Sequence, residues 1–339
     1  VVAVSTFSQK GLKTRLLERF MTIVCSGSLA FDRLADYSGR FSDHIIPDKI
    51  DMLNVCFVTD KVERVHGGTA GNIAYNLYLM GLKTLIVTSV GDDPDGRDYL
   101  ERLKTWGLDV GQITLVPDKA TAGAYIATDK TNNQLIFFNP GAMLVQTGFE
   151  PSSLPGPPSD HLAIISPGGF ADMERLAARY RETDVRFIFD PGQQIPVFSG
   201  QQLLEMLDGS IMLMCNEYEL ELFLQQTQKK LEDLFQYTTA VLTTMGGQGS
   251  RLHTPRGRQH ILTVPVEKIG NPTGAGDAYR AGVLAGLSHG EDILSSCRLG
   301  ATVASFCVEA PGTQSHFFTP GQLLARHFRA FKESPAFLA

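Results

Sequence analysis

The seven residues from Asn271 to Asp277 combine a flexible turn with a carboxylate in a way that suits phosphoryl transfer. They read Asn-Pro-Thr-Gly-Ala-Gly-Asp, and a run of small residues typical of a helix follows over 278–287. Glycines let backbone N–H groups converge on one point, and a helix start adds unpaired donors and a positive dipole end. A phosphate fits there, with Asp277 as the base that takes a proton from an attacking hydroxyl. The alternative is an ordinary loop with Asp277 as a helix cap.

An earlier segment offers groups that suit a sugar. His66 to Asn72 reads His-Gly-Gly-Thr-Ala-Gly-Asn and leads into a helical pattern. The glycine pair, with Gly68 second, permits close approach of the backbone to a ligand, and Asn72 offers both a donor and an acceptor to a polyol. Asp32, just past the first predicted strand, can accept hydrogen bonds from two vicinal hydroxyls. A helix-entry turn and a surface carboxylate are the alternatives.

Two later segments follow predicted strands and carry groups that suit a metal-bound nucleotide. Asn216 and Glu219 have the spacing that places two oxygen-bearing groups on one face of a first helical turn, where they can hold hydrated Mg²⁺. A capping box explains the same spacing equally well. Thr244, Gly246 and Gly249 end a strand with glycines, as a nucleotide-phosphate loop does.

Composition excludes several classes of function. The 339 residues are 43% apolar and 19% charged, which is ordinary for a globular protein, and the net charge of −6 leaves no basic footprint for nucleic acid. No apolar run reaches membrane-spanning length. The five cysteines are widely spaced without a CxxC pair, which predicts free thiols in a reducing, cytoplasmic setting, with Cys25, Cys215 and Cys307 as buried apolar residues. Residues 1–20 are expected to be an N-terminal extension without a secretory signal.

Short apolar runs alternate with helical patterns through most of the chain, which predicts a mostly parallel sheet with helices on both faces. The expected strands are 22–26, 85–90, 162–166, 186–190, 211–215 and 240–244, and the expected helices between them are 71–80, 97–106, 173–182, 200–207 and 217–225. Residues 34–65 and 120–139 instead alternate apolar and polar residues, which predicts strands of a small, separate, half-exposed sheet.

Taken in order, these motifs resemble those of the ribokinase-like (PfkB) carbohydrate and nucleoside kinases over residues 21–325, with Gly91 to Gly96 as a further match. Within that family the chain is most similar to bacterial adenosine kinases of the mycobacterial type. The segments that carry this closer resemblance are 26–32, 39–42, 139–143, 190–194, 272–282 and 312–314.

The resemblance implies ATP-dependent phosphorylation of the 5′-hydroxyl of adenosine, a purine-salvage reaction, with Mg²⁺ as cofactor and K⁺ as an open question. Asp277 would be the base, and the amides of Gly274, Ala275 and Gly276 would hold the γ-phosphoryl group. Asp32, Gly68 and Asn72 would bind the ribose, with Ser28, Phe138, Gln193 and Gln194 near the purine. Thr244, Gly246 and Gly249 would line the ATP site together with the glycines of the anion turn, while Asn216 and Glu219 would organise Mg²⁺ through water.

The implied fold is a three-layer α/β/α domain with a mostly parallel central sheet and a small β-sheet lid. The catalytic domain would comprise 21–33, 66–119 and 140–325, the lid 34–65 and 120–139, and the C-terminal tail 326–339. The lid would close over the sugar and pair across a homodimer. Small-molecule acceptor and ATP are the expected partners, with no nucleic acid and no membrane.

One position departs from the resemblance and keeps a second acceptor in view. Where that branch carries a stacking aromatic in the lid, this chain has Ala124, although Tyr125 is adjacent. Ribose, another sugar or another nucleoside is therefore the alternative acceptor. A ligand-sensing protein on the same scaffold is a third hypothesis, and the intact Asp277 argues against it.

Overall fold

Nine strands form a central sheet whose middle members are buried on both faces. This computed structural model describes residues 21–45, 47–270 and 272–338, so the predicted extension 1–20 and Asn271 lie outside the described residues. Across the sheet the strands run in the order β13 (Gly257–Ile261), β12 (Ser250–Thr254), β11 (Val241–Thr244), β10 (Met212–Asn216), β9 (Arg186–Phe189), β8 (His161–Ile165), β1 (Thr22–Ser26), β4 (Thr84–Gly91) and β5 (Ile113–Val116). Neighbours from β11 to β5 pair in parallel, whereas β11–β12 and β12–β13 are antiparallel.

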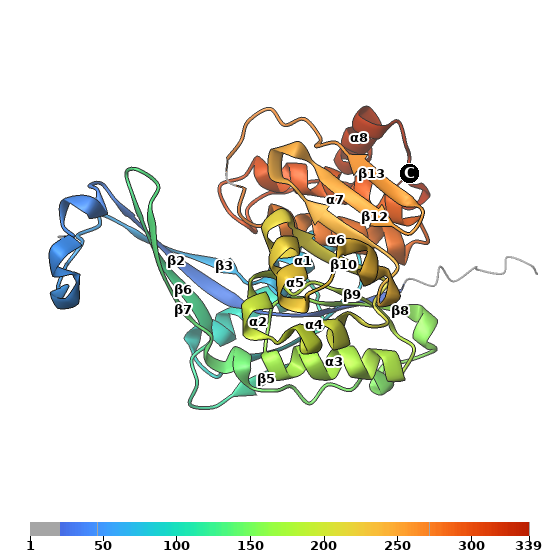
Figure 1. The fold of residues 1–339 in the computed structure, drawn as a ribbon, viewed down its shortest axis with the longest axis horizontal. Helices are drawn as coiled ribbons and strands as arrows, with labels where there is room; N and C mark the ends of the chain where they lie inside the picture. The colour runs from blue at the N-terminus through green and yellow to red at the C-terminus, as the bar shows by residue number, and fades with distance from the viewer. Residues whose placement is uncertain (1–20, 46, 271, 339) are drawn as a thin grey trace, which may run out of the picture.

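Helices cover both faces of this sheet and complete a three-layer arrangement (Figure 1). On one face the buried cluster draws on α1 (Thr69–Leu79), α2 (Pro94–Thr105), α6 (Ala275–Ser288), α7 (Ile293–Val308) and α8 (Pro320–Phe331). On the other it draws on α3 (Phe170–Glu182), α4 (Gly200–Leu207) and α5 (Glu217–Thr227). Successive strand residues alternate between the clusters, with Ile23 in the first and Val24 in the second. This two-sided burial explains why the strands read as continuous apolar runs.

A second sheet of four strands extends away from the α/β body (Figure 1). Its order is β3 (Val62–Gly67), β2 (Ala30–Tyr37), β6 (Ala122–Asp129) and β7 (Gln134–Asn139), and we call it the small sheet. Its register places Asp32 opposite Ala124 and Ala124 opposite Phe138, so these three side chains share one face. Arg33, Tyr125 and Phe137 form the next row and therefore face the opposite way.

The structure confirms the predicted α/β fold with its mostly parallel sheet and separate small sheet. Strand β2 and helix α8 run across predicted domain limits. Strand β2 begins at Ala30 and carries the small sheet four residues further than the predicted limit at 34. Helix α8 runs across the predicted start of a tail at 326 and buries His327, while Leu338 also joins the core, because the amphipathic pattern continues past that point.

The cysteines have the burial that the composition predicts. All five cysteines are free, and Cys25, Cys215 and Cys307 are buried as predicted. Burial raises the pKa of the Cys307 thiol to about 12, so this residue behaves as a small apolar side chain. Among the described residues, none of the helices combines the length and the apolar character that crossing a bilayer requires.

Candidate active site

The turn before α6 has the backbone shape that the glycines predict. Gly274 is the N-cap and has a φ of 82°, in the left-handed region that favours glycine. A Cβ there would lie 3.0 Å from side-chain atoms of Thr313, whose hydroxyl donates to the carbonyl oxygen of His66. The Ala275 amide donates to the Pro272 carbonyl oxygen at 3.1 Å, so this amide closes the turn itself.

A chain of hydrogen bonds fixes Asp277, which stands in the first turn of α6. Asn72 of α1 donates from Nδ2 to Oδ2 of Asp277 at 2.8 Å. Gln314 donates from Nε2 to Oδ1 of Asn72 at 2.9 Å and to the Tyr99 hydroxyl at 2.8 Å. The Tyr99 hydroxyl in turn donates to the Gly67 carbonyl oxygen at 2.7 Å. The network orients the Asn72 amide, which then presents its donor to the carboxylate.

Asp277 has the acid–base properties of a usable general base. Burial raises its pKa from 3.8 to about 6, and the nearby charge of Arg280 and the hydrogen bond from Asn72 oppose that rise. A base is most useful when its pKa lies near the operating pH, because it is then both ionised and able to hold a proton. The site thus has a carboxylate that is ionised at neutral pH and more basic than an exposed aspartate.

One cavity of about 230 Å³ unites the predicted acceptor-binding residues. Its lining comprises Ser28, Ala30, Asp32, Gly68, Thr69, Asn72, Ala124, Phe138, Met143, Pro167, Gln193, Gln194 and Asp277. These come from the loop after β1, the small sheet, the start of α1, the segments after β7, β8 and β9, and the start of α6. Asp277 therefore shares its cavity with all seven residues that the sequence assigns to the acceptor.

Asp32, which lines the cavity, lies close to the first glycine of the Gly-Gly pair. A Cβ on Gly67 would lie 2.8 Å from Oδ2 of Asp32, so glycine leaves the room that this carboxylate occupies. Burial raises the pKa of Asp32. Ser28 is already engaged, because its Oγ accepts from the Thr69 amide at 3.0 Å. Asp32 thus keeps its oxygens available, whereas Ser28 also anchors α1.

The two glutamines that line the cavity differ in how much of their hydrogen-bonding capacity remains for a ligand. Gln194 donates from Nε2 to the Gly168 carbonyl oxygen at 2.7 Å and accepts from the Gly168 amide at 3.2 Å. Its amide therefore ties two loops together. Gln193 lines the cavity without a hydrogen bond of its side chain to any other described residue. Of the pair, Gln193 has the free amide.

The small sheet supplies the aromatic wall. Phe138 lines the cavity and is 52% exposed, so its ring has a free face. Tyr125 lies on the opposite face of the sheet, where the Arg33 guanidinium stands 5.1 Å from its ring centroid. Alternation of side chains along β6 explains this placement. Tyr125 does not fill the space that Ala124 leaves.

The residues predicted for ATP and Mg²⁺ do not line this cavity. Asn216 ends β10 and pairs in register with Thr244 at the end of β11. Asn216 and Glu219 form the capping box, each accepting from the other's amide at 2.8 Å. The other carboxylate oxygen of Glu219 has no hydrogen-bond partner among the described residues, and its role beside Mg²⁺ stays a prediction. The described residues contain no group of three or more His, Cys, Asp or Glu side chains that could hold a metal ion.

The turn after β11 has the glycines that its shape requires. Gly246 and Gly249 have φ values of 55° and 91°, and a Cβ on Gly249 would lie 2.2 Å from the Ile261 carbonyl oxygen. Close approach to β13 therefore explains Gly249 by itself, while open space surrounds Gly246. Their assignment to ATP stays a prediction.

Several residues near the site were not assigned a role from the sequence. Gln314 and Arg280 lie inside segments that carry the family resemblance, but neither type nor spacing shows what they contact. Arg280 pairs with Asp190, which directly follows β9, and Gln314 reaches Asn72 and Tyr99 across 215 or more positions of sequence. Only the folded arrangement brings these partners together.

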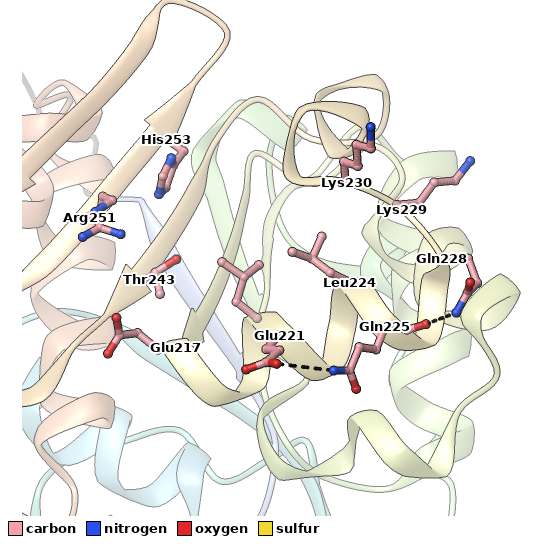
Figure 2. A pocket seen from close by; sticks show the side chains of 11 residues that line it. Glu217, Glu221, Leu224, Gln225, Gln228, Lys229, Lys230, Thr243, Arg251 and His253 are labelled. Carbon is pink, nitrogen blue, oxygen red and sulfur yellow. Dashed lines mark hydrogen bonds between the residues drawn. The ribbon is translucent and has the colours of Figure 1, made fainter.

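A second, more open cavity of about 660 Å³ lies away from the predicted acceptor residues (Figure 2). It runs between α5 and β12, with Glu217 and Glu221 on the helix and Arg251 and His253 on the strand. None of the residues predicted for catalysis lines it. Its mixed charges mark a polar groove at the side of the sheet.

The chain is similar to known proteins over most of its length. A model described as the pfkB family carbohydrate kinase matches residues 46–319. The chain belongs to the PfkB family. The structure of a nucleoside kinase from Burkholderia thailandensis in complex with inosine is 33% identical, covers 93% of this chain and 99% of that one, and has a TM-score of 0.79.

Two archaeal members of the family are also similar over nearly the whole chain. The structure of a Methanocaldococcus jannaschii nucleoside kinase is 27% identical, covers 91% of this chain and 98% of that one, and has a TM-score of 0.81. A nucleoside kinase from Methanothermobacter thermautotrophicus is 30% identical over 288 residues, which is 84% of this chain and 92% of the relative. These relatives carry the broader description nucleoside kinase, so the closer link to adenosine kinases stays a prediction.

Proposed function

We propose that the protein transfers the γ-phosphoryl group of ATP to the 5′-hydroxyl of a purine nucleoside, with adenosine as the expected acceptor. The observation that carries this proposal is the shared cavity of Asp277, Asn72 and Asp32, because it puts a basic carboxylate beside groups that bind a sugar. The Burkholderia thailandensis relative, described in complex with inosine and with ADP-inosine, supports a nucleoside and an adenine nucleotide as the ligands.

In this mechanism different residues of the cavity bind the acceptor and take its proton. Asp32 and Asn72 hold the ribose hydroxyls beside the Gly68 backbone, so that the 5′-hydroxyl reaches Asp277. Asp277 takes its proton as the oxygen attacks the γ-phosphorus, while backbone amides of the turn from Gly274 to Gly276 bind the anionic oxygens. The Ala275 amide must exchange its bond with Pro272 for one with the phosphoryl group, a small reorientation of the turn.

Purine recognition falls to Phe138 and Gln193. The exposed ring of Phe138 offers a face for stacking, and the free amide of Gln193 can donate and accept at the edge of the base. Because one amide pairs equally well with an amino group or a carbonyl oxygen, this arrangement accommodates adenosine and also inosine. Ser28 and Gln194 shape the pocket through their own hydrogen bonds.

The nucleotide site is expected at the ends of β10 and β11. Thr244 and the Gly246–Gly249 turn would border ATP, and Glu219 would fix waters on Mg²⁺. When bound, Mg²⁺ neutralises charge on the phosphate oxygens. Burial raises the pKa of Glu219, and the Arg280 charge and the amide of Asn216 act in the opposite direction.

The small sheet is the expected lid and dimer contact. Its face with Asp32 and Phe138 borders the cavity, so movement of this sheet would cover the acceptor and exclude water. Large apolar side chains remain exposed on both faces of the small sheet, with Ile136 at 55% on the face of Asp32 and Val62 and Phe137 at 61% and 71% on the opposite face. An exposed apolar surface of this kind supports pairing with a second copy.

A free sugar is the second candidate acceptor, and Ala124 is the observation that favours it. The residue leaves one side of the base region without an aromatic wall, and Tyr125 cannot supply it from the opposite face. Release of ADP with adenosine, inosine, guanosine and ribose as acceptors tests both candidates. The proposal expects turnover of purine nucleosides, and robust turnover of ribose without turnover of adenosine would overturn it.

A further inference from the structure

Arg280 places a buried positive charge beside the start of α6. It follows Asp277 by one helical turn and is 9% exposed. A cation near a helix N-terminus is opposed by the positive dipole end, and burial of any charge is costly unless it is compensated. A buried arginine at this position therefore requires a partner that offsets both costs.

Asp190 compensates part of that cost. It directly follows β9 and has no exposed surface. Arg280 donates from Nη2 to Oδ1 of Asp190 at 2.7 Å, and its Nε forms an ion pair with Oδ2. This fork holds the guanidinium in one orientation. It uses Nε and Nη2 and leaves the third nitrogen, Nη1, for another contact.

That third nitrogen lies against the anion turn. A Cβ built on Gly276 would stand 2.7 Å from Nη1 of Arg280, so only a glycine leaves room for the guanidinium there. Nη2 is held by its hydrogen bond to Asp190. Nη1 has no hydrogen-bond partner among the described residues. The charge of Arg280 also reaches the acids around it, since it opposes the raised pKa values of Asp277 and Glu219.

We propose that Arg280 is a catalytic residue whose Nη1 contacts the transferring γ-phosphoryl group, with Asp190 as its positioning residue. The inference rests on the proposed phosphoryl transfer. As the bond from the γ-phosphorus to the bridging oxygen of ADP breaks, the acceptor oxygen forms its bond to phosphorus and its proton passes to Asp277. Arg280 keeps its own proton and stabilises the negative charge on the equatorial oxygens. Arginines in this role accelerate phosphoryl transfer by ~10³–10⁵-fold.

Variants must separate catalysis from folding, because removing Arg280 alone leaves Asp190 as an unpaired buried charge. The double variant Arg280→Met with Asp190→Leu replaces the pair by apolar side chains of similar size and is expected to fold. Arg280→Lys keeps the charge but loses the fork. We expect kcat to fall at least about 10³-fold in the double variant, with ADP and acceptor affinities within about threefold of wild type. Asp190→Asn is expected to lower kcat less and to leave KM for the acceptor unchanged.

Binding of ADP with aluminium fluoride distinguishes a catalytic role of Arg280 from a purely structural one, because a structural role would leave this binding unchanged. Aluminium fluoride mimics the transferring phosphoryl group, so the double variant is expected to lose the tighter binding of ADP–aluminium fluoride over ADP that the wild type shows. A folded double variant that keeps this preference, or keeps kcat within about tenfold, overturns the proposal. So does a wild type without the preference. The comparison is made with and without acceptor, so a wild type that phosphorylates no nucleoside counts against the proposed function alone.

Discussion

Burial of Asp277 carries a cost for folding that an asparagine at the same place should remove. Its pKa rises from 3.8 to about 6 in the folded protein, which corresponds to about 3 kcal/mol. Because the folded state holds the proton more tightly than the unfolded state, this free energy is lost as the pH rises from 3.8 to about 6. Above that range, wild-type Asp277 is a buried charge that only Asn72 and Arg280 partly offset.

Asp277→Asn is therefore expected to make the protein more stable at neutral pH while nearly abolishing catalysis. The asparagine keeps an oxygen for the Asn72 donor but carries no charge. Urea denaturation across this pH range should show a stability gain of about 3 kcal/mol near pH 7 that shrinks toward pH 4. Turnover should fall by ~10²–10⁴-fold, because the amide cannot take a proton.

The matched control is Asp36→Asn, which removes the same formal charge from an exposed position on the small sheet. It separates the effect of burial from that of net charge, and a stability gain of the same size in this variant would assign the effect to net charge. If Asp277→Asn is no more stable than wild type near neutral pH, the buried-base reasoning is refuted. Near-normal turnover in that variant would remove Asp277 from the base role.

Three further predictions concern the same cavity. Wild-type kcat/KM should rise with pH through about 6 as Asp277 ionises, and a flat profile across that range in a steady-state assay would contradict this assignment. Asp32→Ala should raise KM for the acceptor at least about tenfold with a smaller effect on kcat, and an unchanged acceptor affinity by calorimetry would place the sugar elsewhere. Ala124→Phe should lower KM for purine nucleosides but not for ribose, since the side chain faces the cavity beside Phe138. Equal effects on both acceptors would argue against a base-binding role for this wall.

The sequence predicts those site residues whose chemical type and local backbone conformation point to the same role. Gly274 needs a left-handed φ, and Asn72 follows a glycine pair at the start of a helix, so both can be recognised without tertiary information. Asn216 and Glu219 show the limit of this reasoning, because the same spacing serves a capping box and a water-mediated metal site. The structure contains the capping box, and the metal role remains a proposal.

Contacts between distant segments could not be predicted in this way. The bond between Gln314 and Asn72 joins residues 242 positions apart, and nothing in either local pattern specifies its partner. The orientation of Tyr125 depends on the register of β2, β6 and β7, since a shift of one residue would turn it into the cavity. The packing of α8 across position 326 could not be predicted either, because its buried residue His327 is polar and its partner Thr302 lies on α7.

The most direct test of the account is to identify the product formed from Mg²⁺, ATP and adenosine or inosine. Phosphorus NMR on the reaction mixture distinguishes a phosphate on the 5′-oxygen from one at any other hydroxyl and from free phosphate. The arrangement of Asp277, Asn72 and Asp32 predicts a nucleoside 5′-monophosphate in amounts equal to the ADP released. ADP formed with free phosphate alone, or phosphorylation of ribose but of neither nucleoside, would contradict it.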